Sequence, residues 1–486
     1  MKMMKQILTA TLLATAVTMS VRAQETQPAP APTAVAAVPV AVGPITNQPE
    51  FARNISASLV LVEVTLRNEN GSREEAGQGI LLNDQGVILV SGGLLPEIVP
   101  LDFIKDIKVR APGGKFQSVP AKILGRSHNR LFIFLKADKP IAGTPLDLSR
   151  TANPDLGTKL LAIGLMGKDA GYGTYVGEGS VKARLNMQHE LVISNSFSLT
   201  RSNSPVFDVN TGALLGLTIP SQGENMQLRL GNQTQNVELS DGDQTGTLLP
   251  WSEIAGMLKE IPTKPFESKR GWLGIDGITG IEEDMRTLYK ITQPAGVTIG
   301  SVVPDMAGEK AGLHSKDIIL TINGKPFSDS IVPALMVQHY SRATMQAKPG
   351  DKVVLGILRD GAKQDVTVTL GAFPKIPSEM KHVYSPQVGL VTRDVVFADT
   401  YTRKLPAEQK GVIIALVKNG SAASLGQTPL AVGMLVTKVN DQEVNSQKEF
   451  LDLVAKEFKD GSPREMVFVV IQRDGATAVC RIDLSK

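Results

Sequence analysis

The stretch Asp317-Ile-Ile-Leu-Thr-Ile-Asn-Gly-Lys-Pro326 decides how the second half of the chain is interpreted. Apolar residues on the N-terminal side of an Asn-Gly pair predict a strand, a tight turn and a second short strand, because Asn and Gly adopt the positive φ angles that such turns need. Just before it, Pro304 to Leu313 is rich in Ala and Gly and predicts a short helix. A longer helix is expected over Ile331 to Thr344.

This order of elements occurs twice. Trp272-Leu-Gly274-Ile returns as Gln387-Val-Gly389-Leu, and the equivalent glycines are 115 residues apart. A repeat at a fixed spacing indicates a duplicated fold. The second long helix is expected over Gln447 to Phe458, where an apolar stripe follows a capping box. We therefore predict two α+β domains, over residues 266–374 and 383–486.

The preceding part of the chain, residues 51–263, has an all-β pattern. Short apolar runs such as Ser58 to Arg67, Gly86 to Val90 and Leu131 to Lys136 alternate with turn signals, as strands of a barrel or sandwich do. A closing helix is expected over Pro250 to Ile261, where apolar residues recur at helical spacing.

The N-terminus has the pattern of an export signal. Residues 1–23 combine two lysines, a short apolar stretch and a small-residue cleavage site ending at Ala23. Residues 24–50 are rich in Ala and Pro and are expected to be a disordered linker. The apolar stretch is too short to span a membrane. The single cysteine, Cys480, alternates with polar residues and is expected to pack inside a strand, with an intermolecular disulfide as the alternative.

Composition excludes several classes of function. The formal net charge is only +3, with 51 Lys plus Arg against 48 Asp plus Glu, and no segment concentrates one sign. A nucleic-acid partner is therefore not expected. Five scattered His and one Cys offer no set of metal ligands. We expect neither a metal ion nor another cofactor.

The chain resembles the HtrA family. In the first repeat the resemblance rests on Lys310-Ala-Gly-Leu-His-Ser-Lys-Asp-Ile-Ile319 and Ile322-Asn-Gly-Lys-Pro326, and in the first half on Gly77 to Leu95. It implies a mostly β chain, with a trypsin-like double β-barrel followed by two PDZ domains. It also implies location in the periplasm or cell envelope, or secretion, binding of unfolded polypeptides or exposed C-termini, and assembly as a homotrimer.

The resemblance assigns a peptide-binding loop to each repeat. A PDZ domain adds a peptide as an extra strand at a sheet edge, beside a helix, while backbone N–H groups of a glycine-bearing loop hold the terminal carboxylate. Glycine lets the backbone approach the ligand, because it carries no Cβ. The matching positions are Trp272, Leu273, Gly274, Ile275, Val388, Gly389 and Leu390. The alternative is that both glycines only permit tight turns.

The catalytic triad of the family is degenerate in this sequence. Gly93 stands at the position of the His, and Arg130 at that of the Asp, with Asn129 as the neighbouring alternative. Ser202 aligns with the nucleophile. The glycines that shape the oxyanion hole are replaced by Thr200, Arg201, Asn203 and Ser204, so we expect the special backbone of that loop to be lost. Arginine cannot accept a hydrogen bond from an imidazole.

The sequence therefore predicts a non-catalytic protein that binds polypeptides in envelope protein quality control, as a chaperone-like factor or as a regulator of an active protease partner. Two alternatives stay open. One is an active serine endopeptidase that uses Ser202 with an unrecognised base, for which His128 and His189 are the histidines of the first half. The other is a structural envelope protein whose grooves are closed.

Overall fold

A computed structural model describes residues 43–111, 118–167, 170–195, 203–219, 225–230, 233–238, 246–265, 270–425, 428–459, 461 and 464–484. The expected signal peptide, most of the expected linker, and the candidate nucleophile Ser202 with Thr200 and Arg201 lie outside these residues. Within them no helix has the length and apolar character that crossing a bilayer requires.

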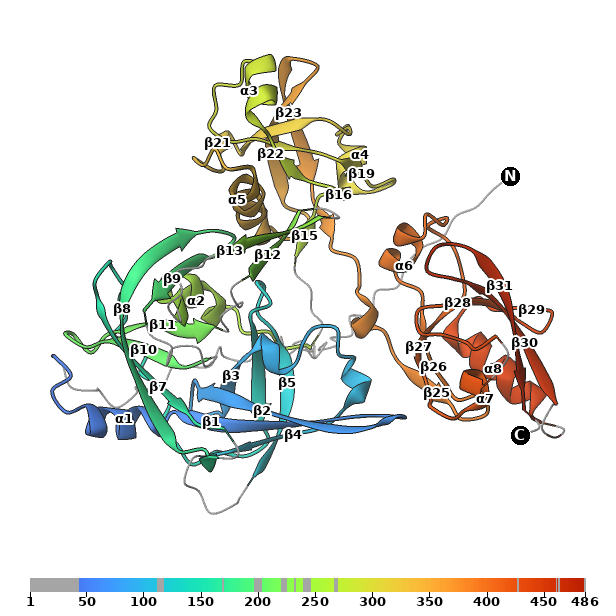
Figure 1. Cartoon of the computed structure of the whole chain (residues 1–486), viewed down its shortest axis with the longest axis horizontal. Helices are drawn as coiled ribbons and strands as arrows, with labels where there is room; N and C mark the ends of the chain where they lie inside the picture. The colour runs from blue at the N-terminus through green and yellow to red at the C-terminus, as the bar shows by residue number, and fades with distance from the viewer. Residues whose placement is uncertain are drawn as a thin grey trace, which may run out of the picture. The chain divides into compact units, whose positions relative to one another are not determined.

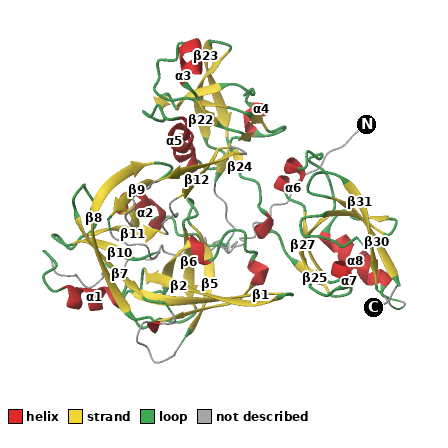
Figure 2. Cartoon of the chain, viewed as in Figure 1, coloured by secondary structure: helices red, strands yellow, loops and turns green. Residues whose placement is uncertain are grey.

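Strands dominate the molecule (Figure 2), and the first half forms two closed six-stranded barrels (Figure 1). The strand orders are β1-β2-β3-β6-β5-β4 and β10-β11-β14-β9-β8-β7. The first barrel consists of β1 (Leu59–Asn68), β2 (Gly71–Leu81), β3 (Val87–Ser91), β4 (Ile104–Arg110), β5 (Val119–Arg126) and β6 (Phe132–Ala137), with short 3-10 turns η1 (Gly92–Leu94) and η2 (Leu101–Phe103). The second consists of β7 (Lys159–Leu165), β8 (Thr174–Asn186), β9 (Glu190–Ser194), β10 (Pro205–Asp208), β11 (Leu214–Ile219) and β14 (Gly246–Pro250), and a separate hairpin is formed by β12 (Asn225–Leu230) and β13 (Gln233–Glu238).

The two barrels share one apolar core. Leu89 and Phe134 of the first barrel and Leu161 and Phe207 of the second belong to a single cluster of buried side chains. The alternation of side chains along each strand places one set inside its barrel and the other set in this shared layer. The layer fixes the two barrels against each other and so positions the residues between them.

Two helices cover this shared core. Helix α1 (Gln48–Ser56) begins inside the end of the expected linker, because Asn47 accepts a hydrogen bond from the Glu50 backbone and caps the helix. Helix α2 (Trp251–Leu258) lies where the apolar spacing predicted it and buries Ile254 and Met257.

The first repeat has its own core, which includes Val297, Ile319 and Leu355. Its long helix begins at Pro333, where the missing N–H of proline does no harm. Its elements are β15 (Gly271–Trp272), β16 (Ile275–Asp276), β17 (Thr279–Gly280), α3 (Glu283–Leu288), β18 (Val297–Thr298), β19 (Ser301–Val302), α4 (Ala307–Lys310), β20 (Ile318–Ile322), β21 (Lys325–Pro326), α5 (Pro333–Met345), β22 (Lys352–Arg359), β23 (Ala362–Thr369) and β24 (Gly371–Ala372).

The second repeat follows the same order, after a 3-10 turn η5 (Pro377–Glu379). Its core includes Leu390, Ile414 and Phe450, together with Cys480. Cys480 is fully buried opposite Phe468, which confirms its packing role. The elements are β25 (Val383–Ser385), β26 (Leu390–Asp394), α6 (Phe397–Thr402), β27 (Val412–Val417), α7 (Ala422–Leu425), β28 (Leu435–Val439), β29 (Gln442–Glu443), α8 (Gln447–Glu457), β30 (Glu465–Ile471) and β31 (Thr477–Asp483).

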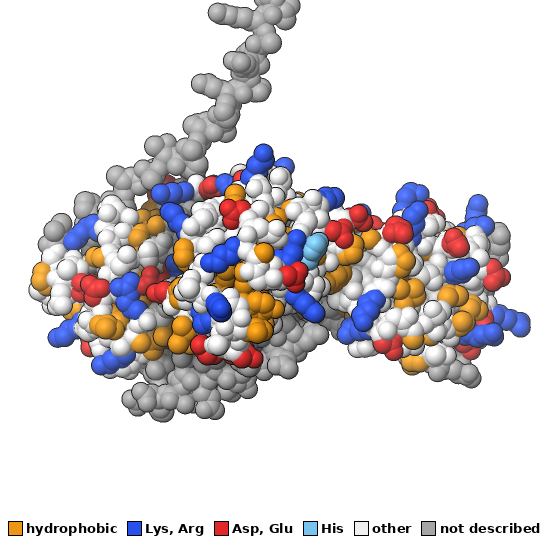
Figure 3. Space-filling model, turned by 90° about the horizontal axis from the view of Figure 1, so that it is seen from above, with side chains coloured by type: hydrophobic (Ala, Val, Ile, Leu, Met, Phe, Trp, Pro, Cys, Tyr) orange, Lys and Arg blue, Asp and Glu red, His pale blue; other side chains and the backbone are white. Residues whose placement is uncertain are grey.

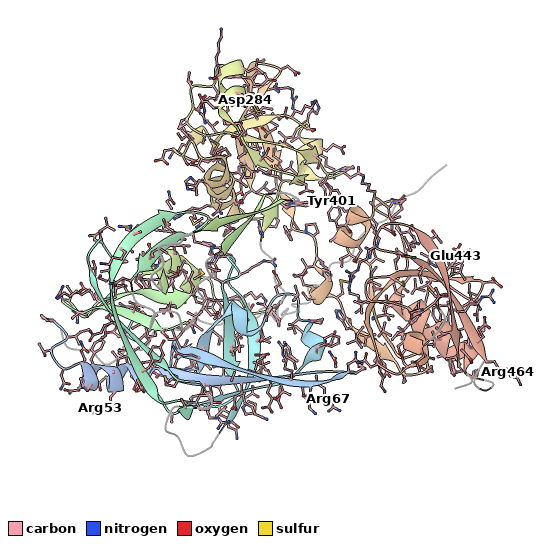
Figure 4. The ribbon with its side chains drawn as sticks, in the orientation of Figure 1. Arg53, Arg67, Asp284, Tyr401, Glu443 and Arg464 are labelled. Carbon is pink, nitrogen blue, oxygen red and sulfur yellow. The ribbon has the colours of Figure 1, made fainter. Side chains whose placement is uncertain are left out.

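The surface carries charges of both signs. Lys and Arg side chains are interspersed with Asp and Glu on the face shown in Figure 3. Exposed side chains such as Arg67 near the end of β1 and Glu443 on β29 extend from the strands (Figure 4). This mixture agrees with the small net charge of the sequence.

Candidate functional site

The position aligned with the catalytic His lies directly after strand β3. Ser91 ends that strand and its Oγ accepts a hydrogen bond from the Gly93 N–H at 3.3 Å, which starts the turn η1. The N–H of Gly92 donates to the Leu131 carbonyl at 2.7 Å. A Cβ on Gly93 would meet only the Ser91 Oγ, at 3.6 Å. A Cβ would therefore fit at position 93, next to the loop that carries the predicted Asp position.

Arg130 occupies that loop with a left-handed backbone, at φ 61°. Its guanidinium forms an ion pair with Glu97, four residues after Gly93. Nearby, Arg126 donates to the Leu95 carbonyl at 2.6 Å, and burial lowers the pKa of Arg126 to about 10. Two arginines thus hold the segment after η1, and the Asp position carries a cation where the triad needs an anion.

The side chain of Asn129, the alternative at the Asp position, forms hydrogen bonds within its own turn. Its Oδ1 accepts from the Ser127 Oγ at 2.6 Å and from the Leu131 N–H at 3.2 Å. These bonds close the β5–β6 connection as an Asx-type turn. The Asn129 carbonyl is therefore occupied within its loop.

The residue after the candidate nucleophile connects the two barrels. Asn203 is only 1% exposed, and its Nδ2 donates to the backbone carbonyls of Gln78 and Leu89 at 3.1 and 3.0 Å. The Gln78 Nε2 donates to the Asn203 carbonyl at 2.7 Å, and the Gln78 Oε1 accepts from the Leu165 N–H at 2.6 Å. Asn203 and Gln78 therefore form a polar bridge between β2 and β3 of one barrel and the loop before β10 of the other.

The backbone conformation of Asn203 also bears on the expected loss of the special loop conformation. Its φ of 67° is in the left-handed region that a glycine would favour. Asn adopts this conformation more readily than other non-glycine residues. At this one residue the backbone has a glycine-like conformation, while Thr200 and Arg201 lie outside the described residues, so the expectation for the loop stays a prediction. The Asn203 Oδ1 is buried and lacks a hydrogen-bond partner among the described residues, an arrangement that costs about 1–3 kcal/mol.

Ser204 is buried and fully engaged. Its Oγ lies 2.8 Å from the Tyr175 hydroxyl, and its N–H donates to the Thr218 Oγ1 at 2.9 Å. The Asn203 N–H donates to the Thr218 carbonyl at 2.7 Å. The backbone donors of residues 203 and 204 therefore face Thr218 of β11, so neither N–H is directed at a substrate.

The three candidate triad regions converge on the end of β3. Gly93 follows this strand, Leu131 beside Arg130 contacts Gly92, and Asn203 beside Ser202 binds Leu89. The two histidines of the barrels have other surroundings. His189 lies 3.5 Å from Glu253 of helix α2. His128 lies in the β5–β6 connection, and burial is the main cause that lowers its pKa.

In the first repeat, the predicted loop lines a pocket of about 380 Å³. The backbone of Gly274 has φ 70°, and a Cβ there would lie 2.3 Å from the Met306 Cβ. Only glycine fits this close approach. Gly274 itself does not line the pocket, but its neighbours do. Strand and helix side chains on the two walls are Trp272, Leu273, Ile275, Ile278, Tyr340 and Thr344.

This pocket has one polar group without a partner and a closed end. Burial raises the pKa of the Tyr340 phenol, and its hydroxyl has no hydrogen-bond partner among the described residues. Further along β17, a Cβ on Gly280 would come within 2.3 Å of the Pro333 carbonyl oxygen. Strand β17 and the first residue of helix α5 are therefore in close contact at this point.

The matching loop of the second repeat is arranged differently. Val388 and Leu390 are fully buried in the core, and Gly389 has φ 76° with its virtual Cβ 2.2 Å from the Ser421 Cβ. The Gly389 N–H donates to the Ser385 carbonyl at 2.9 Å. A donor that a PDZ loop would present to a ligand is thus already paired within the chain.

Sequence reasoning named Asn203 only as a replaced loop glycine and missed its bridging role, and it also missed the Gly280 contact and the strand at Val383–Ser385. A detectable signal was present for two of them. Asn is the residue most able to replace glycine at positive φ, and a Val-Tyr pair just before a Pro-containing turn favours a hairpin. The Gly280 contact depends on tertiary packing and had no local signal. No group of three or more potential metal-ligating side chains is found within the described residues.

Comparison with known proteins agrees with this architecture. A PDZ domain family model matches residues 271–370. The chain is 30% identical over 205 residues to a probable periplasmic serine endoprotease DegP-like of Ectopseudomonas mendocina, covering 41% of this chain and 40% of that protein. It is 31% identical over 213 residues to the protein of that name from Chlamydia trachomatis, covering 42% and 40%. The matched segments thus span less than half the length of these curated relatives.

Among solved structures, a variant of the HtrA-type protease AlgW with a decapeptide superimposes with a TM-score of 0.50 and 16% identity. The superposition covers 68% of this chain and 99% of that one. At this identity the similarity concerns the fold, and it agrees with the pair of closed barrels followed by the first repeat. The chain is therefore a homologue of the HtrA/DegP serine endoproteases, built as a trypsin-like double barrel followed by a PDZ domain.

Proposed function

We propose that this protein is an exported, non-catalytic member of the HtrA type, which binds unfolded polypeptides or exposed C-termini and does not cleave them. The observation that carries the proposal is the set of side chains around the end of β3. Gly93 has no proton acceptor, Arg130 is paired with Glu97, and the Asn129 oxygen is occupied by its own turn. Ser202 would then lack both a base and the carboxylate that orients it.

The size of this defect supports the proposal. In serine proteases the triad acts as a unit, and removing the His alone lowers turnover by about a millionfold. The Asp contributes by holding the imidazole and stabilising its charged form. A guanidinium at position 130 would disfavour that charged form, even if a base were supplied from elsewhere. Both losses act on the same proton transfer, so residual hydrolysis should be close to background.

The pocket of the first repeat supports the binding role. Its walls combine apolar side chains such as Leu273 and Ile278 with polar ones, the Tyr340 hydroxyl has no partner among the described residues, and Gly274 allows the loop to pass close to Met306. A peptide would add along β16, with its terminal carboxylate toward Trp272 to Ile275. Contact between Gly280 and Pro333 would limit the bound segment to a few residues.

The cellular setting belongs to the same proposal. Periplasmic relatives and the predicted export signal support action in the periplasm or cell envelope. There the protein would hold unfolded substrates, or regulate an active protease partner, and would assemble as a homotrimer. Gel filtration with light scattering on the mature chain tests the assembly, and a monomer would contradict that part.

The rival function is an active serine endopeptidase. Its support is the similarity to probable serine endoproteases and the presence of a serine at position 202. Casein cleavage by the purified chain distinguishes the two, with Ser202→Ala as the matched control. We expect no cleavage above that control. Cleavage that Ser202→Ala removes would establish the rival.

A restoration series tests the physical reason. Gly93→His is sterically permitted, because only the Ser91 Oγ approaches the new Cβ, and Arg130→Asp supplies the orienting carboxylate. Neither change alone is expected to give activity, whereas the pair gives the serine a base if the loop before Asn203 still carries the oxyanion donors. Activity in Gly93→His alone would argue against Arg130 as the second defect.

A further inference from the structure

The second repeat differs from the first at the strand edge where a PDZ domain takes its peptide. Strand β26 pairs with β27 along one edge and with β25 along the other (Figure 1). Residues Leu390, Val391 and Thr392 have a partner on both sides. In the first repeat, within the described residues, β16 pairs only with β19 and β17 only with β18. The peptide-binding edge is thus covered in the second repeat, whereas in the first repeat it has no strand partner among the described residues, which leave out 266–269.

The strand that covers this edge has the orientation of a ligand. β25 runs antiparallel to β26, with Ser385 opposite Leu390 and Val383 opposite Thr392. Its C-terminal end therefore lies at the loop before β26. There the Ser385 carbonyl accepts the Gly389 N–H at 2.9 Å, in the place where a PDZ loop would bind a terminal carboxylate.

Helix α8 closes the other side of the segment. Gln447, the first residue of that helix, donates from Nε2 to the carbonyl of Lys381 at 3.1 Å and to the carbonyl of Thr392. Its backbone N–H donates to Asp394 at 2.6 Å. One buried side chain thus contacts both the covering segment and the strand β26. The segment from Lys381 runs along the strand beside the start of the helix, as a bound peptide would.

We propose that residues 381–385 are a built-in ligand that occupies the peptide groove of the second repeat. This inference uses the proposed peptide-binding role of the first repeat only as a standard for comparison. It implies that peptides free in solution bind to the first repeat. Val383 and Tyr384 are only partly buried and lie outside the apolar core of the second repeat, whereas Ser385 is buried. We expect the covering segment to be displaceable, because most of its side chains do not belong to that core.

The tether makes the occupied state dominant. A connection of four residues, Pro386 to Gly389, joins the segment to the strand that it covers. Such short tethers give effective concentrations of the order of millimolar. A free peptide at tens of micromolar would therefore not compete, and the second repeat would bind an external C-terminus only after the segment had been removed.

The test uses the full chain and a probe taken from the segment itself. Fluorescein-labelled Lys381-His-Val-Tyr-Ser385 with a free carboxylate is titrated in fluorescence polarisation against the unmodified chain and against the double variant Val383→Pro, Tyr384→Pro. Prolines remove the N–H groups that β25 offers to β26 and leave β26 unchanged. We expect the double variant to bind at least about tenfold more tightly than the unmodified chain.

Two controls assign the binding to the second repeat. Adding Gly389→Val to the double variant should remove the gain, whereas adding Gly274→Val, which affects the first repeat, should leave it unchanged. If C-terminal peptides do not bind to the first repeat, that result counts against the proposed function and does not affect the inference about the second repeat. An affinity that is equal in the unmodified chain and the folded double variant would overturn the inference about the second repeat.

A second measurement decides the matter if the double proline variant does not fold. Gln447→Ala removes the bonds to Lys381 and Thr392 and alters no strand residue. In hydrogen–deuterium exchange we expect the amides of Val383–Ser385 to lose protection at least about threefold, while those of β30 and β31 are unchanged. Unchanged protection of the segment would contradict a displaceable built-in ligand.

Discussion

Replacing Asn203 by Asp tests whether the hydrogen bonds that the Asn203 side chain donates stabilise the contact between the two barrels. The two side chains have the same shape, and both tolerate the positive φ that this position requires. The change replaces one NH2 group, which donates to the carbonyls of Gln78 and Leu89 at 3.1 and 3.0 Å, by an oxygen. Packing is unchanged, so the difference in stability reports on the hydrogen bonds and the charge.

The magnitude follows from the two acceptors. Each buried carbonyl that loses its donor costs about 1–3 kcal/mol, and a carboxylate facing two carbonyl oxygens at 1% exposure adds a buried unpaired charge. We expect Asn203→Asp to lower the free energy of unfolding of the double barrel by about 3–5 kcal/mol at pH 7. Asn210→Asp, on the exposed turn after β10, is the matched control and should cost less than about 0.5 kcal/mol.

The stability deficit of Asn203→Asp should change with pH in one direction. Burial and the two carbonyls raise the pKa of the introduced carboxyl above its unfolded value of about 3.9. A group with a raised folded pKa loses stability as the pH rises from the unfolded towards the folded pKa. The deficit of the variant should therefore shrink as the pH falls from 7 toward about 4, because the protonated carboxyl can donate to one carbonyl.

Urea unfolding followed by Trp251 fluorescence measures this deficit, with Trp272→Phe present in every chain so that only the barrel tryptophan reports. A loss below about 1 kcal/mol, or a loss equal to that of Asn210→Asp, would refute the bridge. A stability deficit that grows as the pH falls would show that the pKa of the introduced carboxyl is not raised in the folded state.

Three further predictions concern the repeats. Gly274→Val should weaken binding of C-terminal peptides to the first repeat at least tenfold, because φ is 70° and the new side chain meets Met306; unchanged polarisation titrations would contradict this. Cys480 should resist a thiol reagent at pH 8 until the second repeat unfolds, because the thiol is buried and burial raises its pKa; rapid labelling of the native chain would be the contrary result. Asp317→Ala should destabilise the first repeat by about 1–3 kcal/mol in thermal unfolding, since it removes the buried carboxylate that accepts two hydrogen bonds from Arg359; a loss equal to that of the exposed Asp329→Ala would contradict it.

The architecture was predictable because its local signals agree with its packing. Turn residues at Asn323-Gly324, the spacing of Ile254 and Met257, and Pro333 at the first turn of a helix each favour the element that the structure contains. The predicted helix over Gln447 to Phe458 corresponds to α8 with a difference of one residue at its end. Alternating or periodic apolar residues determine such elements without reference to distant parts of the chain.

The site was predictable only as a set of missing groups. The sequence predicted Gly93 and Arg130 at the His and Asp positions, and the two residues flank Gly92 and Leu131, which are hydrogen-bonded to each other in the fold. What fills the space between the barrels was not predictable, because Asn203 and Gln78 are 125 residues apart. The covering of β26 by β25 is different, because the two strands form a local hairpin. The Val383-Tyr384 pair before a Pro-containing turn favours such a hairpin, so this pairing could have been predicted.

Labelling with a fluorophosphonate probe tests the central claim most directly, because the reagent reports whether Ser202 is activated without requiring a particular substrate. We expect the purified, mature chain to be labelled no faster than its Ser202→Ala variant at pH 7 to 8. Stoichiometric labelling that disappears in Ser202→Ala would show that a base acts on this serine and would contradict the non-catalytic function.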